Sequence, residues 1–433
     1  MQNENQNSNI DNNQSIVPPT AQNSQTIQSR STRNALLFIA VVLIVGAIYF
    51  LNHGKVDVRG INTPAVNVTT IDQLATSTTF GIDQTSSTTV SAKKSKDIKA
   101  SLVTLVNSDK NAGYTLAKEI SQPSGFVNTP NNLPITISQY IGKKVILVDF
   151  WTYSCINCKR TQPYLNAWYD KYESKGLVII GVHTPEFDFE KIHDNVLKAV
   201  TKENIKYPVV QDNDYATWSA YGNQYWPRKY LIDMAGYVVY DKIGEGGYDE
   251  TEKKIQNLLT ERSKILGVNT QIDSGMSAPA DAVTTIQTQS PETYFGSSRN
   301  QYLANGKGGV NGVQNFILPT QFDLNSLYLG GSWNVLGQEA DAKSDVSIVY
   351  KFNAKEVYFV AGSVNANGSD IEVLLDGKSV IQKGKDVITS GGKTTVHVTN
   401  DTLYHLIDLP QPGEHTLEIR GKAGLKGFTF TFG

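Results

Sequence analysis

The sequence predicts an α/β domain followed by an all-β domain, preceded by one apolar segment long enough to cross a membrane. Between residues 145 and 262, short apolar runs alternate with stretches of helical periodicity, as in proteins that cover a sheet with helices. After residue 290 the pattern changes to short alternating strands separated by turn residues. The run at 35–51 is apolar without interruption over 17 residues, which distinguishes it from the rest of the chain.

Composition indicates a protein of more than one domain. Its 433 residues are enough for two or three domains, at about 150 residues per domain. The formal net charge of −2 gives no electrostatic argument for binding nucleic acid. The chain has 2 cysteines, too few for a disulfide-rich scaffold, and their close spacing indicates redox or metal chemistry.

The amino-terminal part is expected to be a tail, an anchor and a linker. Residues 1–34 are rich in Asn, Gln and Ser and cannot bury enough apolar surface to fold, so we expect a disordered tail. Residues 35–52 are the expected transmembrane anchor, because about 17–25 apolar residues span a bilayer. Residues 53–122, largely rich in Thr and Ser, are the expected linker, with a short helix or two after residue 98.

A cleaved signal peptide is the alternative to an anchor. No small-residue cleavage site follows the apolar run, and the polar segment before it is longer than a signal peptide allows. Basic residues flank the run on both sides, so charge alone does not orient it. We expect a single-pass protein of the cell membrane with extracytoplasmic carboxy-terminal domains, because the short tail is the easier part to leave inside.

The α/β domain is expected over residues 123–264, with a second linker at 265–289. Apolar, β-branched runs predict five strands, the last two forming a hairpin, at 145–150, 177–182, 207–211, 228–232 and 237–243. Helical spacing predicts helices after residue 158, before residue 204 and over 249–262; the first has its apolar face at Leu165, Trp168, Tyr169 and Tyr172.

The all-β domain is expected over residues 290–433. At least seven short strands are predicted, at 347–352, 356–360, 371–375, 394–398, 404–409, 415–420 and 427–432. Together with the Asn-Gly and Asp-Gly turn pairs at 367–368 and 376–377, they indicate a β-sandwich. Four aromatic residues could form a sugar-stacking platform, although such residues more often lie in the core of a sandwich: Trp333, Tyr350, Tyr358 and Tyr404.

Both cysteines lie where the first predicted strand passes into a helix. Cys155 falls at the helix amino terminus, where free N–H groups and the helix dipole favour a thiolate anion. Cys158, one turn later, faces the same side and can attack a mixed disulfide formed at Cys155. A zinc site would need further ligands, and no second Cys pair exists, so we expect a redox couple and no metal.

Three polar residues near this junction could influence the thiols. Asp149 lies between apolar neighbours six residues before Cys155, so burial should raise its pKa and let it exchange the proton of Cys158. His183 and Glu186 lie on the loop after the second strand, which in α/β sheets borders the active cleft. Either residue could tune the thiols or only cap the loop.

These motifs resemble a known family. Val-Asp-Phe-Trp, then Cys-x-x-Cys-Lys, then the proline at 163, is similar to the thioredoxin active site. The longer strings at 150–158, 183–187 and 225–233 resemble the thioredoxin-like part of DipZ-type proteins, which are TlpA-like redoxins. The resemblance covers roughly residues 125–433 and implies a thioredoxin-like domain followed by a jelly-roll-like, carbohydrate-binding-module-like sandwich.

The resemblance also implies the remaining site residues. Trp226–Pro227 would be a cis peptide facing the Cys pair, although only about 5–6% of X–Pro bonds are cis in general. An ordinary proline at the start of a strand is the alternative. Together with Trp151, these residues would bind an extended substrate.

The implied function is a membrane-anchored, extracytoplasmic thiol–disulfide oxidoreductase that uses the Cys-Ile-Asn-Cys couple without a cofactor. It would reduce disulfides of exported proteins, take electrons from a membrane donor of the CcdA/DsbD kind, and could bind glycan through the sandwich. Ile156-Asn157 replaces the Gly-Pro of thioredoxin, so the choice between reductase and oxidase stays open.

Two other functions remain as alternatives. An AhpC/TSA-type thiol peroxidase resembles Pro-x-x-x-Thr-x-x-Cys, and Thr152 fits this pattern but Val148 does not. The other is a glycan- or cell-wall-binding protein whose redoxin domain is secondary.

Overall fold

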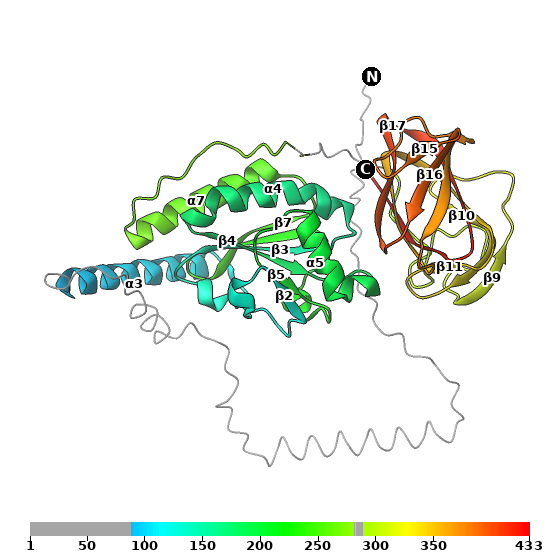
Figure 1. Ribbon diagram of the computed structural model, residues 1–433. Coiled ribbons are helices and arrows are strands. Elements are labelled where there is room, and N and C mark those ends of the chain that lie inside the picture. The colour runs from blue at the N-terminus through cyan, green and yellow to red at the C-terminus, as the bar shows by residue number, and fades with distance from the viewer. Residues whose placement is uncertain (1–87, 281, 283–288) are drawn as a thin grey trace, which may run out of the picture. The chain divides into compact units, whose positions relative to one another are not determined.

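The computed structural model describes residues 88–280, 282 and 289–433 (Figure 1). The expected disordered tail and the expected transmembrane anchor at 35–52 lie outside these residues. Among the described helices, none has the length and apolar character needed to cross a membrane.

A helix occupies much of the segment that was expected to be a linker. Helix α3 (Thr88–Asn111) is 24 residues long, so it starts earlier and is longer than the short helices predicted after residue 98. Its Lys, Ala and Leu residues are good helix formers and outweigh the Ser and Thr content of the segment. Leu102 and Asp109, two turns apart on one face, are its buried residues in the part whose side chains are described.

The α/β domain contains a seven-stranded sheet in the order β1-β7-β6-β3-β4-β5-β2. Its strands are β1 (Thr115–Leu116), β2 (Gly125–Val127), β3 (Val145–Trp151), β4 (Leu177–His183), β5 (Val209–Gln211), β6 (Arg228–Ile232) and β7 (Tyr237–Ile243). Strands β3, β4 and β5 are parallel, and β6 pairs antiparallel with β3 and β7. All five predicted strands are present, and β3 and β4 are buried along their whole length, as expected for central strands with both faces covered.

The helices of this domain are α4 (Ile156–Tyr172), α5 (His193–Lys202), α6 (Ala216–Ala220) and α7 (Tyr248–Leu266), with short 3₁₀ helices η1 (Pro130–Asn132), η2 (Ser138–Tyr140), η3 (Glu173–Lys175) and η4 (Asp188–Lys191). Helices α4 and α7 lie side by side on one face of the sheet (Figure 1), and the rings of Tyr164 and Tyr248 stack 3.6 Å apart between them. Of the predicted apolar face of α4, Leu165, Trp168 and Tyr172 are buried and Tyr169 is half-buried. The helix places its amino terminus at the end of β3, where both cysteines lie.

The C-terminal domain is built from antiparallel strands over residues 290–433. They are β8 (Thr293–Tyr294), β9 (Gly312–Phe316), β10 (Leu327–Val335), β11 (Ala340–Ala342), β12 (Val346–Ser363), β13 (Ser369–Leu375), β14 (Lys378–Ser379), β15 (Ile388–Ser390), β16 (Lys393–Val398), β17 (Thr402–Gly421) and β18 (Leu425–Phe432). Strand β12 pairs with β10, β17 and β18 and therefore connects much of the domain. The predicted β-rich domain is confirmed, and its jelly-roll topology stays a prediction.

Two long strands replace four of the short strands predicted from the sequence. Residues 347–352 and 356–360 are both part of β12, and residues 404–409 and 415–420 are both part of β17. The ladder between them shifts register after Ala354, whose partner is Gly413, and resumes at Glu356, whose partner is Asp408. Pro410 and Pro412 fall in the residues skipped by this bulge, where a missing N–H breaks no ladder bond.

The four aromatic residues considered for a sugar-stacking platform are buried. Trp333 and Tyr350 have no exposed surface, while Tyr358 and Tyr404 are 7% and 8% exposed. The indole N–H of Trp333 donates to the Gly330 carbonyl, and the Tyr350 hydroxyl is bonded to Thr293. These rings lack a free face for a sugar, so the core position that the sequence favoured is confirmed and these four residues form no stacking platform.

Candidate redox site

The cysteine pair lies at the junction of β3 and α4. Cys155 is the N-cap of α4, with an extended backbone, and its Sγ accepts a hydrogen bond from the Cys158 N–H at 3.2 Å. Both cysteines are free thiols; Cys155 is half-buried and Cys158 is buried. The Cys155 sulfur therefore has both an approach from solvent and an N–H donor that stabilises a thiolate, as the sequence predicted.

Cys158 has the opposite environment. Its side chain is 3% exposed, and burial raises the thiol pKa well above its ordinary value. The hydrogen bond with Cys155 and the charges of Cys155 and Asp149 raise it further. Cys158 therefore holds its proton more tightly than an ordinary thiol, and its sulfur is less accessible than that of Cys155.

Asp149 lies on β3 inside the sheet, with 1% of its surface exposed. Burial raises the pKa of its carboxyl to about 7, and the charge of Lys229 partly opposes this shift. Its Oδ1 has no hydrogen-bond partner among the described residues. A carboxyl that titrates near neutral pH beside Cys158 can take up and return the proton of that thiol.

Lys229 is a site residue that the sequence reasoning missed. It lies on β6 directly opposite Asp149 in the antiparallel ladder, so the two side chains share one face of the sheet. The lysine has no exposed surface, and its Nζ donates to the Gly244 carbonyl at 3.1 Å. Burial lowers its pKa, while Asp149 and Cys158 raise it. The sequence did contain a hint of this position. Strand alternation over residues 228–232 puts Lys229 on the same face as the apolar Leu231, which indicates a buried lysine.

The peptide bond between Trp226 and Pro227 is cis, as predicted. Arg228 pairs with Phe150, so Pro227 lies at the carboxyl end of β3, the end from which the cysteine turn emerges. The Trp226 and Trp151 rings are only 7% and 3% exposed. Their predicted contact with substrate therefore has little exposed ring surface to support it, whereas the position of Pro227 agrees with the expected cleft.

His183 lies next to the turn that precedes Cys155. Its Nε2 is 3.4 Å from the Thr152 hydroxyl, and its ring stacks on Tyr153 with the centroids 5.6 Å apart. Complete burial lowers its pKa to about 3, so the imidazole is neutral. Through its contacts with Thr152 and Tyr153, His183 can influence the position of the turn that carries Cys155.

Glu186 points toward the C-terminal β domain. Its Oε1 accepts hydrogen bonds from the Tyr294 hydroxyl at 2.8 Å and from Arg299 at 2.7 Å. The same loop carries Glu190, which has no exposed surface and which the sequence reasoning did not consider. Glu190 Oε1 accepts from the Ser154 hydroxyl at 2.6 Å and from the Ser154 N–H at 3.3 Å.

One group of potential metal ligands exists in the described part of the chain. The ligand atoms of Glu356, His405 and Asp408 lie within 4.8 Å of one another. Arg160 forms an ion pair with Glu356 at 2.6 Å, and His405 Nε2 is hydrogen-bonded to the Ile407 carbonyl at 2.9 Å. A guanidinium against this group disfavours a bound cation, so the cluster is better explained as an ion-pair site.

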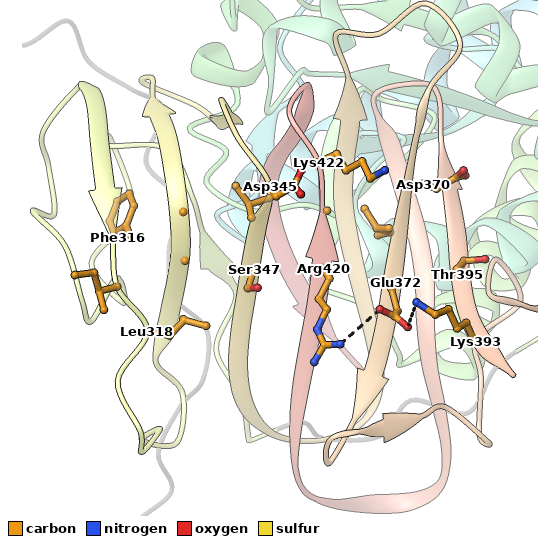
Figure 2. A pocket seen from close by; sticks show the side chains of 16 residues that line it. Phe316, Leu318, Asp345, Ser347, Asp370, Glu372, Lys393, Thr395, Arg420 and Lys422 are labelled. Atoms are coloured by element: carbon orange, nitrogen blue, oxygen red, sulfur yellow. Dashed lines mark ion pairs between the residues drawn. The ribbon is translucent and has the colours of Figure 1, made fainter.

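A groove of about 690 Å³ crosses one face of the β domain (Figure 2). Charged side chains from neighbouring strands face it, and Glu372 forms ion pairs there with Lys393 at 3.2 Å and with Arg420 at 3.7 Å. The buried ring of Phe316 is the aromatic side chain in its lining. The groove is therefore a polar surface and lacks an aromatic platform.

Two families match the chain. The family described as Redoxin matches residues 121–259, and the family described as "Thioredoxin like C-terminal domain" matches residues 290–433. Protein DipZ of Mycobacterium tuberculosis is 38% identical over 320 residues, which are 73% of this chain and 43% of DipZ. The chain thus spans less than half the length of that relative.

Two shorter relatives are named thiol-disulfide oxidoreductases. YkuV of Bacillus subtilis is 31% identical over 130 residues, which are 30% of this chain and 87% of YkuV. ResA of Bacillus thuringiensis is 31% identical over 137 residues, which are 32% of this chain and 73% of ResA. The resemblance seen in short motifs therefore extends over long stretches of the chain.

Proposed function

The chain belongs to the thioredoxin-fold redoxins of the TlpA and DipZ kind, and from this we propose that it is a thiol–disulfide oxidoreductase acting through Cys155 and Cys158. One observation carries the proposal. A half-buried thiol caps α4 and accepts the Cys158 N–H, while the second thiol is buried beside a carboxyl with a pKa of about 7. This arrangement separates an attacking thiol from a resolving thiol.

In the reductive direction, the Cys155 thiolate attacks one sulfur of a substrate disulfide. The substrate S–S bond breaks, a mixed disulfide forms at Cys155, and the released substrate thiolate takes up a proton. Cys158 then gives its proton to Asp149 and attacks the Cys155 sulfur, which releases the second substrate thiol. Two electrons pass to the substrate and leave a Cys155–Cys158 disulfide, which a dithiol donor reduces to close the cycle.

The direction of electron flow and the partners are finer parts of this proposal. The apolar run at 35–51 supports a membrane anchor with the redox domain outside the cytoplasm. Exported proteins with disulfides would then be the substrates, and a membrane donor of the CcdA/DsbD kind would supply electrons. Protease added to intact cells should release a soluble fragment that starts within residues 53–87; full protection would contradict this topology.

A thiol peroxidase is the weaker candidate. Position 148, where the peroxidase pattern has proline, is a valine that pairs with both β4 and β6 within the buried strand β3. A proline at this position would remove an N–H from the ladder of a central strand, so the proline of the peroxidase motif does not suit this strand. Rapid consumption of hydrogen peroxide by the reduced protein would favour this candidate over ours.

Glycan binding by the β domain is a separate proposal. The groove in Figure 2 supports it through its charged side chains, which can bond to hydroxyl groups, although it offers no stacking surface. Titration with cell-wall glycan fragments, using Glu372→Gln as the altered groove, would test it. Binding that is equal in both proteins would exclude this groove as the site.

The test of the main proposal uses the reduced full chain. We expect it to reduce insulin disulfides in the presence of excess dithiol, and a limiting amount of iodoacetamide to label Cys155 before Cys158. Mass spectrometry of the labelled peptides identifies the alkylated thiol. First labelling of Cys158, or no acceleration of insulin reduction, would overturn the assignment.

A further inference from the structure

The loop that follows β4 contacts both the cysteine turn and the β domain. On one side, Glu190 accepts the Ser154 hydroxyl at 2.6 Å and the Ser154 N–H at 3.3 Å. Ser154 is 2% exposed and immediately precedes Cys155, whose sulfur caps α4. A carboxylate that holds both the N–H and the hydroxyl of this residue fixes the approach of the chain to Cys155.

The other oxygen of the same carboxylate stays within the loop. Glu190 Oε2 accepts the N–H of Glu186 at 2.6 Å and the N–H of Phe187 at 3.0 Å. Three of its four partners are backbone N–H groups, which can only donate, so Glu190 is held as an acceptor from both sides. Burial and the charge of Glu186 raise the pKa of its carboxyl, and the hydrogen bonds that it accepts oppose this shift. One side chain therefore joins the cysteine turn rigidly to residues 186–187.

Those two residues in turn hold the β domain. The Glu186 carboxylate binds the Tyr294 hydroxyl at 2.8 Å and Arg299 at 2.7 Å. The Arg299 guanidinium lies over the Tyr294 ring, 3.7 Å from its centroid. Glu292 is the other acid in this cluster, 2.8 Å from the Tyr294 hydroxyl, and burial raises its pKa to about 7. Glu186 and Tyr294 are buried while Glu292 and Arg299 are half-buried. The cluster is therefore charge-assisted and partly shielded from solvent, where its hydrogen bonds are stronger than at the open surface.

Apolar contacts strengthen the same junction. The ring of Phe428 lies with its centroid 5.3 Å from that of Phe187 and 4.8 Å from that of Phe189. Phe187 is 1% exposed and Phe428 is 3% exposed. The loop is therefore held between the β domain and the cysteine turn and is not free to move independently of either.

We propose that Glu190 is a positioning residue through which the β domain sets the geometry of Cys155. The route runs from Tyr294 and Arg299 to Glu186, along the loop to Glu190, and from Glu190 to Ser154 beside Cys155. Loosening it lets the turn move, so the Cys155 sulfur is held less well against the Cys158 N–H and its thiolate is stabilised less. This inference rests on the proposed role of Cys155 as the attacking thiol.

The test removes one hydrogen bond at each end of this series of contacts, at Tyr294 and at Ser154. Tyr294→Phe removes the hydroxyl on the β domain and keeps the ring. Ser154→Ala removes the hydroxyl on the cysteine turn and keeps the Glu190 side chain. The readout is the rate constant for iodoacetamide labelling of Cys155 in the reduced full chain, measured across pH. We expect Tyr294→Phe to slow labelling at neutral pH by at least about twofold, a small but measurable coupling.

The double variant separates coupling from local damage. In the Ser154→Ala background, Tyr294→Phe should have little further effect, because the route is already broken. Tyr328→Phe is the matched control, since its hydroxyl binds Asp323 within the β domain and it should leave labelling unchanged. Arg299→Lys replaces Tyr294→Phe if that variant fails to fold.

Two results would overturn the proposal: an unchanged Cys155 rate in Tyr294→Phe, or an equal slowing in both backgrounds. The labelling needs no protein substrate, so its outcome is independent of disulfide-reductase activity. Failure of the proposed function would appear as absent insulin reduction with the labelling pattern intact. If this inference fails, the protein still reduces insulin, but the Tyr294 and Ser154 variants show no coupling in the Cys155 labelling rate.

Discussion

At the scale of single residues, the two thiols differ in burial and in their neighbours. Cys155 caps a helix and is half-buried, whereas Cys158 is buried with Asp149 and Lys229 beneath it. The sequence placed both cysteines and Asp149 correctly because all three lie within ten residues along one strand and its following turn. Lys229 was missed because only strand pairing brings it opposite Asp149.

We expect serine substitutions to separate the roles of the thiols. Cys158→Ser should trap substrates as stable mixed disulfides at Cys155, because no resolving thiol remains. Cys155→Ser should trap almost none, since the remaining thiol is buried and its pKa is raised. Non-reducing electrophoresis after incubation with a disulfide substrate checks this; equal trapping by both variants would show that the roles are not divided.

We expect turnover to rise with pH through about 7, where Asp149 ionises and can accept the Cys158 proton. Asp149→Asn should abolish this rise and slow turnover by about 100-fold, the lower end for loss of a general base. The initial attack by Cys155 should stay nearly unchanged. This is measured as the single-turnover rate of mixed-disulfide formation, compared between Cys158→Ser and the double variant Asp149→Asn/Cys158→Ser. A variant that keeps the wild-type pH profile would show that Asp149 is not the proton acceptor.

Lys229→Met should move the same pH profile to higher pH. The lysine charge lowers the Asp149 pKa, so its removal lets burial raise that pKa further. We expect a shift of at least about one pH unit, as for an opposite charge nearby. Lys206→Met, which removes an exposed lysine paired with Asp170, is the control and should leave the profile in place.

At the scale of elements, helix α3 docks on the hairpin between β6 and β7 through two acids. Asp109 on α3 and Asp233 in the hairpin turn are 7% and 1% exposed. Burial raises the pKa of Asp233 to about 8, and the neighbouring Asp109 adds to the shift. The stability that this raised pKa supplies is present below about pH 4 and is lost as the pH rises through about 8.

Asp109→Asn should therefore stabilise the protein, and more at pH 9 than at pH 5. The amide removes the repulsion that an ionised Asp233 meets in the folded state, whereas at pH 5 Asp233 is still protonated. Thermal unfolding at the two pH values measures the effect. Asp97→Asn, an exposed acid on the same helix, should give no pH-dependent difference. A gain that is equal at both pH values would contradict the explanation by repulsion between the two carboxylates.

At the scale of the whole molecule, the β domain contributes to the core of the α/β domain. Tyr294, Val360 and Phe428 belong to the same buried cluster as the strands of the redox sheet. Arg160, two residues after Cys158, forms a buried ion pair with Glu356 at 2.6 Å. Such contacts make the β domain part of the environment of the redox site, which a domain boundary drawn from sequence does not convey.

Phe428→Ala should destabilise both domains together. The ring packs edge-on against both Phe187 and Phe189, and its loss should cost about 3–5 kcal/mol for a buried aromatic side chain. We expect limited proteolysis to cut both domains at a lower denaturant concentration. Ile381→Ala, at a side chain that is 84% exposed, is the control and should have no effect. Earlier cleavage of the β domain alone would show that the domains unfold separately.

The sequence by itself determined the redox strand, the helix that follows it and the two cysteines at their junction. These depend on local periodicity and on free N–H groups at a helix start, which neighbouring residues set. The family motif added the cis peptide at Trp226–Pro227, which the structure has.

Only the tertiary structure decided that Glu190 holds Ser154, 36 residues away, and that Arg160 meets Glu356, 196 residues away. It also decided that Trp333 and Tyr350 are core residues. Long-range contacts of this kind depend on which faces of which strands meet, and no local pattern in the chain encodes that.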